Sequence, residues 1–155
     1  MAFQVKYAIR RIYGGISKSM TRDMEIIFPG GKKVDAFYKG FKIETDQSER
    51  SGGKGLAPAP FDLFLSSIGT CAGIYVLSFC QERSIPTDKM KLVLRTERNR
   101  ESWMVTKIEI EIQVPPEFPA KYKEAVIKAA ELCTVTKHLY DPPIFDIHTK
   151  IQHKS

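Results

Sequence analysis

The sequence predicts an α+β fold with a mainly antiparallel sheet. An uncharged, strongly apolar segment runs from residue 63 to 81 and separates two groups of strand-like segments. Residues 107–114 alternate between polar side chains and isoleucine or valine, the pattern of a strand with one wet and one buried face. A second helical stripe follows at 119–132. Strands, a helix, more strands and a second helix in this order are typical of α+β proteins.

Length and composition are those of a globular protein. The chain has 155 residues, close to the ~150 of a typical domain, so we expect a single domain over 1–155. With 43% apolar and 27% charged residues it is neither collagen-like nor disordered. The longest near-apolar stretch, 71–77, is far shorter than the ~20 residues of a membrane-spanning helix, and residues 1–6 lack the apolar core of a secretory signal. These features predict a cytoplasmic protein without a membrane partner.

The first strands are predicted as a β-meander over 24–45. Two strand-like segments flank a turn at 29–32, and a third, at 41–45, alternates apolar with charged side chains. The N-terminal segment, 1–22, is less regular, although a short helix within it fits the apolar spacing. A loop rich in Gly and Pro then leads to the apolar segment.

The central helix is predicted over 61–82. Pro60 suits the first helical position, and Asp62 suits the first turn, where the helix dipole favours an acid. Apolar side chains lie on all sides, as in a buried helix. At ~1.5 Å per residue the helix would be ~33 Å long, which a small domain cannot easily enclose. We therefore expect a partner subunit to cover part of it.

The remaining chain predicts a β-hairpin over 90–114 and a helix with a terminal strand over 119–151. The hairpin turn is placed at 99–102. A short helical turn is expected at 135–140, followed by a break at Asp-Pro-Pro and a last strand over 145–151.

The formal net charge of +6 is compatible with an anionic partner, but its distribution does not favour nucleic acid. The 24 Lys and Arg residues are interleaved with 18 acidic residues along the whole chain. The densest basic pair, Lys32-Lys33, falls in a predicted turn. The three histidines and Cys133 lack the spacing of a zinc site, so no metal is expected.

Helix geometry separates the three cysteines. Cys80 lies nine residues after Cys71, which is half a turn around the helix and ~13.5 Å along it, so the two cannot pair across the ~7 Å that a disulfide requires. Cys80 is therefore interpreted as core packing. Cys71 and Cys133 point inward from two different helices. On spacing alone they are either ordinary buried thiols or a reactive pair.

Two motifs resemble those of the OsmC/Ohr family (osmotically inducible protein C-like and organic hydroperoxide resistance proteins). The first runs from Gly52 to Cys71: a Gly-rich loop, a Pro, an acid-Leu pair, an apolar helix and a cysteine. The second is Cys133-Thr-Val-Thr-Lys137, which is similar to the family's Cys-Pro-Val-Ser/Thr-Lys. The resemblance covers about residues 24–151.

The resemblance implies an intertwined homodimer, with antiparallel sheets packed around long central buried helices. It also implies a thiol-dependent peroxidase that reduces organic hydroperoxides and hydrogen peroxide in oxidative stress defence. Cys71 would be the thiolate that becomes a sulfenic acid, and Cys133 would close a disulfide with it. No cofactor is implied, only an external dithiol reductant.

Two further positions of the family's pattern are a glutamate and an arginine. Peroxidase members carry a glutamate ten residues before the first cysteine, where this chain has Phe61. Asp62 lies on the opposite side of the helix from Cys71 and is interpreted as a first-turn acid. The arginine that accompanies the family's cysteine has four candidates here: Arg50, Arg10, Arg11 and Arg22.

Three functions remain open at this point. The first is the two-cysteine peroxidase, and the second is a non-catalytic module of the same fold that binds a small ligand beside Cys71. The third is nucleic-acid binding through Gly52-Gly-Lys-Gly55, a GxxG loop of the kind that clamps a nucleic-acid backbone. We rank them in this order, because a lone GxxG loop is a weak signal.

Overall fold

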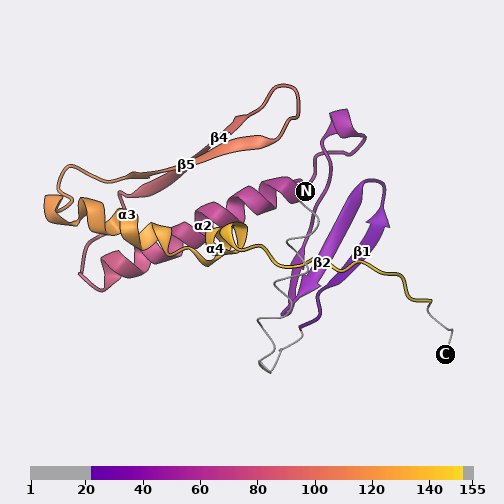
Figure 1. Cartoon of the computed structure of the whole chain (residues 1–155), viewed down its shortest axis with the longest axis horizontal. Helices are drawn as coiled ribbons and strands as arrows, with labels where there is room; N and C mark the ends of the chain where they lie inside the picture. The colour runs from indigo at the N-terminus through magenta and orange to yellow at the C-terminus, as the bar shows by residue number, and fades with distance from the viewer. Residues whose placement is uncertain (1–21, 152–155) are drawn as a thin grey trace, which may run out of the picture. The chain divides into compact units, whose positions relative to one another are not determined.

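The structure is a computed structural model that describes residues 22–151 (Figure 1). The chain divides into two compact units, one ending at Ala57 and the other starting at Pro58. The expected short helix before residue 22 lies outside the described residues.

The N-terminal unit contains the predicted meander. Strands β1 (Glu25–Gly30), β2 (Lys33–Tyr38) and β3 (Phe41–Ile43) form an antiparallel sheet in the order β1-β2-β3. Gly31 turns the chain between β1 and β2 with a φ of 62°, a conformation that glycine adopts without strain. The meander is therefore confirmed, with β1 extending through Pro29 into the expected turn.

A buried carboxylate organises the loop that follows β3. Asp46 is 2% exposed and accepts backbone N–H bonds from Gln47, Lys54 and Leu56 at 2.8, 3.1 and 3.2 Å. The short 3-10 helix η1 (Glu49–Ser51) lies within this loop. These hydrogen bonds offset the cost of burying the charge, because each one stabilises the ionised form.

Helix α2 (Pro60–Gln81) forms the centre of the C-terminal unit and agrees with the predicted central helix. Pro60 occupies its first turn, and Asp62 accepts the Ala59 N–H at 3.0 Å, as a first-turn acid should. One stripe of the helix is buried within this chain, namely Ile68, Ala72, Val76 and Cys80. Another side is open, because Ile74 is 54% exposed.

The hairpin β4 (Lys91–Arg98) and β5 (Val105–Gln113) lies along one side of α2 (Figure 1). Leu92 pairs with Ile112 and Leu94 with Ile110, which confirms the predicted alternation. Leu92 and Ile112 pack against the core, whereas Arg95 forms ion pairs with acidic residues of β5. The Asn99 side chain closes the turn by accepting two backbone N–H bonds.

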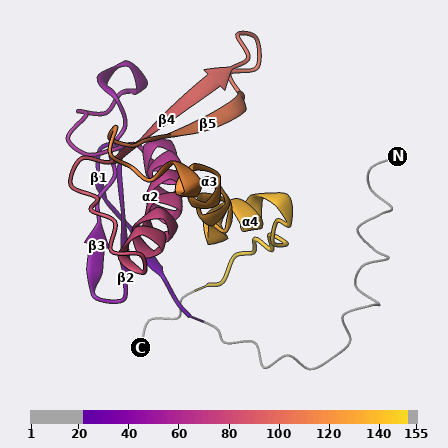
Figure 2. The same ribbon diagram turned by 90° about the vertical axis from the view of Figure 1, so that its left-hand side faces the viewer.

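The chain then folds back onto α2 through the 3-10 helix η2 (Ala120–Tyr122) and the helices α3 (Lys123–Glu131) and α4 (Thr134–Tyr140). Figure 2 shows α2 and α3 side by side, and both helices contribute to one core cluster. Its buried members are Val76, Cys80, Phe118 and Val126. The predicted α+β class is confirmed, with antiparallel sheets and the helical turn at 135–140 in place.

The terminal strand predicted over 145–151 is wrong for the single chain. No strand is assigned to these residues, and Phe145, Ile147 and Ile151 are 81%, 92% and 80% exposed. An alternating pattern supplies an apolar face, but a strand also needs a neighbouring strand to receive its backbone hydrogen bonds. Within the described chain, this segment has no such neighbour.

By length and composition, α2 could cross a membrane, although the sequence predicted no such segment. Its most apolar window has a mean hydropathy of 1.8, and 28% of that window is buried. The longest unbroken apolar run, of seven residues, underestimated this segment. The small and hydroxyl side chains between its apolar residues lower the mean hydropathy of the window only slightly. The core helix of a soluble protein meets the same criteria, and α2 packs against α3, α4 and β4.

Candidate functional site

The two cysteines singled out by the sequence lie together in the C-terminal unit. Cys71 is in the middle of α2 and is half-buried, whereas Cys133 precedes α4 and is 1% exposed. Cys71 is one of the neighbouring groups that lower the pKa of Cys133. Both thiols are free. One accessible and one enclosed thiol therefore meet where α2 and α4 pack.

Cys133 is held by hydrogen bonds from the start of α4. Its sulfur accepts the Thr136 N–H at 3.5 Å and, as a thiol, faces the carbonyl oxygen of Ile68 at 3.9 Å. Burial favours the neutral thiol, but hydrogen bonds from the side chain and backbone of Thr136, from Cys71 and from the Val135 N–H favour the thiolate. Together they outweigh burial and lower the pKa of Cys133 below its usual value.

A polar bridge ties the two helices together beside this pair. The hydroxyl oxygens of Tyr75, on α2, and Thr134, on α4, lie 3.0 Å apart. Tyr75 is one helical turn after Cys71, and Thr134 follows Cys133 directly. The bridge therefore fixes the separation of the backbone segments that carry the two thiols.

An apolar cleft of about 550 Å³ opens beside Cys133. Ile68 and Thr136, whose backbone groups contact the sulfur of Cys133, are part of its wall. Neither cysteine lines the cleft itself. The other wall residues are mostly aromatic or aliphatic: Phe61, Phe64, Trp103, Met104, Val105, Ile108, Ile110, Leu139 and Tyr140, with Thr106 and Lys107.

Phe61, at the position where peroxidase members of the family carry a glutamate, is part of the cleft wall. Its ring lies 5.3 Å from that of Phe64, and the guanidinium carbon of Arg98 lies 4.9 Å from the Phe61 ring centre. Arg98 also donates a hydrogen bond to the carbonyl oxygen of Trp103 at 3.2 Å. Sequence reasoning missed Arg98, because only the hairpin's return past α2 brings residue 98 to residue 61.

None of the four arginines considered from the sequence belongs to the C-terminal unit, which carries the two cysteines. Arg10 and Arg11 lie outside the described residues, while Arg22 and Arg50 belong to the N-terminal unit. None of these four arginines is therefore assigned as a partner of Cys71.

Cys80 differs from the other two cysteines in its surroundings. It is 0% exposed and its sulfur lies 3.9 Å from that of Met90. Burial raises the pKa of Cys80, and Arg83 offsets this only in part, so the thiol stays neutral. Its interpretation as core packing is confirmed. Among residues 22–151, no group of three or more His, Cys, Asp or Glu side chains could hold a metal ion.

Comparison with known proteins places this arrangement in a family. The sequence profile described as OsmC-like protein matches residues 52–148, whereas no curated protein matches the chain significantly. One similar solved structure is a Psychrobacter arcticus protein named for osmotic stress and detoxification responses, with a TM-score of 0.65, 21% identity and coverage of 79% of this chain and 90% of that one.

Two further solved structures share the fold. The OsmC-like protein of Mycoplasma pneumoniae has a TM-score of 0.62 at 14% identity, covering 79% of this chain and 89% of its own. An OsmC-like protein of unknown function from Vibrio cholerae has a TM-score of 0.56 at 13% identity, covering 76% and 93%. These similarities concern the fold alone. The family profile, in contrast, matches more than half of the sequence. The chain therefore belongs to the OsmC-like protein family.

Proposed function

We propose that this protein is a thiol-dependent peroxidase that reduces organic hydroperoxides, and hydrogen peroxide, through Cys71 and Cys133. The observation that carries the proposal is the position of the Cys133 sulfur, 3.9 Å from the carbonyl oxygen of Ile68, which lies about one turn before Cys71 on α2. A disulfide can form between two such segments where the Cα atoms of the cysteines lie within about 7 Å. The chemistry needs no bound cofactor.

Proton transfer within the pair would prepare the nucleophile. The hydrogen bonds around Cys133 favour its thiolate, and we propose that this thiolate takes the proton of the Cys71 thiol when the peroxide is bound. Passing this proton to Cys133 leaves Cys71 as the thiolate. Cys71 is also the more accessible sulfur, so it is the one that an entering peroxide meets.

The oxidative half of the cycle consumes one peroxide. The Cys71 thiolate attacks the oxygen that bears hydrogen, the O–O bond breaks, and a sulfenic acid forms on Cys71. The departing alkoxide takes the proton from Cys133 and leaves as an alcohol. The Cys133 thiolate then attacks the Cys71 sulfur, a disulfide forms, and the released hydroxide becomes water by taking up one proton.

The reductive half returns both thiols. An external dithiol attacks the Cys71 sulfur, since Cys133 is enclosed, and Cys133 departs as a thiolate. A thiol with a low pKa is the better leaving group in this exchange. The dithiol is oxidised to a disulfide in the process, so electrons pass from the reductant to the peroxide.

The apolar cleft supports an organic rather than a strongly hydrated substrate. Its wall includes Phe61, Phe64 and Tyr140, and Ile68 and Thr136 connect it to Cys133. Phe61 stands in place of the glutamate of peroxidase members, and two cations lie near the cleft: Lys107 in its wall and Arg98 over the Phe61 ring. We propose that Arg98 faces a peroxide oxygen. We propose that the alkyl group occupies the cleft while the peroxide approaches Cys71.

We also propose that the protein acts as a homodimer in the cytoplasm. The open side of α2, with Ile74 more than half exposed, is the surface that a second subunit would cover. Free thiols suit a reducing compartment.

Activity of the purified protein tests the proposal directly. With cumene hydroperoxide and a dithiol, the wild-type protein and Cys80→Ser should consume peroxide at equal rates. Cys71→Ser should be inactive, and Cys133→Ser should stop after one turnover with a sulfenic acid on Cys71. Peroxide turnover that survives Cys71→Ser would contradict the proposal.

The second candidate function is non-catalytic binding of a small apolar ligand. The observation in its favour is the 550 Å³ cleft, which falls within the size range of ligand sites and has no acidic residue in its wall. A ligand retained in native mass spectrometry, together with no peroxide turnover by the reduced wild-type protein, would favour this function instead.

A further inference from the structure

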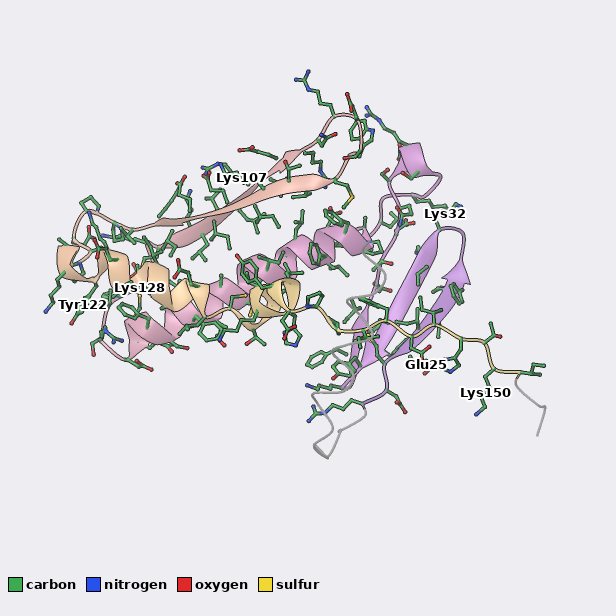
Figure 3. The ribbon with its side chains drawn as sticks, in the orientation of Figure 1. Glu25, Lys32, Lys107, Tyr122, Lys128 and Lys150 are labelled. Atoms are coloured by element: carbon green, nitrogen blue, oxygen red, sulfur yellow. The ribbon has the colours of Figure 1, made fainter. Side chains whose placement is uncertain are left out.

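A basic pocket in the N-terminal unit is separate from the chemistry of the two cysteines. It has a volume of about 290 Å³ and lies between the β1–β2 turn and the loop after β3. Three lysines line it: Lys32 from the turn, Lys33 at the start of β2, and Lys54 from the loop. Figure 3 shows Lys32 at this turn. We propose that this pocket binds a small ligand through a phosphate group.

The charge of the pocket wall is positive. Across the part of the chain that the structure describes, none of the three lysines forms an ion pair. Among the described residues of the wall, Asp46 is the one acid, so their side chains sum to a net charge of +2. Both Asp46 oxygens already accept backbone N–H groups. The three lysines therefore share one pocket with a carboxylate that accepts backbone hydrogen bonds and lies near the charge of Lys33.

The glycines of the loop give the pocket its shape. A Cβ at Gly53 would lie 1.9 Å from the carbonyl oxygen of Gln47, so only glycine allows the loop to close around Asp46. At Gly52 a Cβ would lie 3.6 Å from Cε of Lys32, so the lysine stem runs along this glycine. Small residues in the wall leave space for a ligand between the lysines, and the closed loop holds Lys54 on the same side.

The chemistry of the wall selects the class of ligand. Ammonium groups bind phosphate oxygens as point charges with strong, charge-assisted hydrogen bonds. The volume is at the lower end of the roughly 300–1,000 Å³ of ligand pockets. The wall residues that the structure describes include no aromatic ring, so they offer no stacking platform of the kind that single-stranded nucleic acids use. These features favour a compact phosphate or diphosphate over a polynucleotide.

Calorimetric titration of the reduced, full-length protein with inorganic pyrophosphate and with inorganic phosphate tests this site. We expect one saturable site that binds pyrophosphate more tightly than phosphate and weakens as sodium chloride is raised. Lys32→Gln, Lys33→Gln and Lys54→Gln should each weaken binding about three- to tenfold, and the triple variant should abolish it. Lys128→Gln, an exposed lysine on α3, is the matched control and should bind like the wild type.

Two outcomes would overturn the proposal. One is the absence of saturable binding, or binding that the single lysine variants leave unchanged. The other is a single-stranded oligonucleotide that binds more tightly than pyrophosphate and depends on the same lysines, which would assign the pocket to a polynucleotide backbone. Thermal unfolding of each variant shows whether a loss of binding reflects a loss of fold, and the single variants decide if the triple variant is unfolded.

Discussion

The hydroxyl groups of Tyr75 and Thr134 meet at 3.0 Å and join α2 to the start of α4. Each is a near neighbour of one candidate redox cysteine, Tyr75 of Cys71 and Thr134 of Cys133. The contact joins residues 59 positions apart in sequence, so it exists only when the C-terminal unit is folded. It is the polar brace that holds the two thiol-bearing segments at a fixed separation.

Removing this brace should loosen the thiol pair. Tyr75→Phe deletes one partner of a single hydrogen bond, so we expect the free energy of unfolding to fall by about 1 kcal/mol. We also expect slower formation of the Cys71–Cys133 disulfide after a pulse of peroxide, measured by peptide mapping against time. Tyr140→Phe, whose residue is 86% exposed, is the control for stability. Equal disulfide rates in Tyr75→Phe and wild type would argue against a bracing role.

The hydroxyl of Thr136 should tune the acidity of Cys133. Thr136→Val keeps the shape and the backbone N–H but removes the side-chain hydrogen bond that lowers the pKa of Cys133. The pKa of Cys133 should therefore rise in this variant, which thiolate absorbance as a function of pH would detect in a Cys80→Ser background. Disulfide reduction should also slow, because Cys133 becomes a poorer leaving group. A pKa unchanged from that of the matched Thr70→Val variant would exclude this role for the hydroxyl.

Asp46 should make stability depend on acid pH. Burial opposes its ionisation, but backbone hydrogen bonds from Leu56, Gln47 and Lys54, and the charge of Lys33, together lower its pKa below the ordinary 3.8. A lowered pKa stabilises the fold above the unfolded-state value, and this stabilisation is lost as the pH falls through the lower, folded-state value. Asp46→Asn should thus unfold at a lower temperature at neutral pH.

The same substitution should also change the acid limb of the stability curve. Circular dichroism melts recorded from neutral pH to below 3.8 should show a smaller fall for Asp46→Asn than for the wild type. Parallel curves for the two proteins would show that Asp46 is not the responsible group.

Adjacent residues of α3 offer a matched test of the core. Val126 is 2% exposed in the cluster with Phe118, whereas the next residue, Ile127, is 52% exposed. Val126→Ala should lower the free energy of unfolding by about 2 kcal/mol, since it removes two buried methyl groups and leaves a cavity. Ile127→Ala should cost less than about 1 kcal/mol. Urea titration of both variants measures the difference, and equal losses would contradict the described packing of α3.

Local patterns were enough to predict most of the elements. The alternating residues of β5 form one apolar face. At the start of α2, the proline lacks a backbone N–H group and the acid accepts one, so fewer N–H groups are left without a partner. Asp-Pro-Pro ends α4. Each of these signals acts over a few residues, so it can be read without a partner. The terminal strand failed for the same reason: residues 145–151 carry the local pattern but have no neighbouring strand within residues 22–151.

The sequence by itself determined the α+β class, the order of the elements and which three thiols the chain contains. Only the tertiary structure decided that Cys71 is half-buried while Cys133 is enclosed, that the sulfur of Cys133 faces the carbonyl oxygen of Ile68, and that Arg98 lies over the ring of Phe61. Solvation and charge at a side chain depend on groups that are distant in sequence and become neighbours only on folding. Secondary structure is governed mainly by local backbone and hydrophobic preferences, whereas the properties of the site arise from long-range packing.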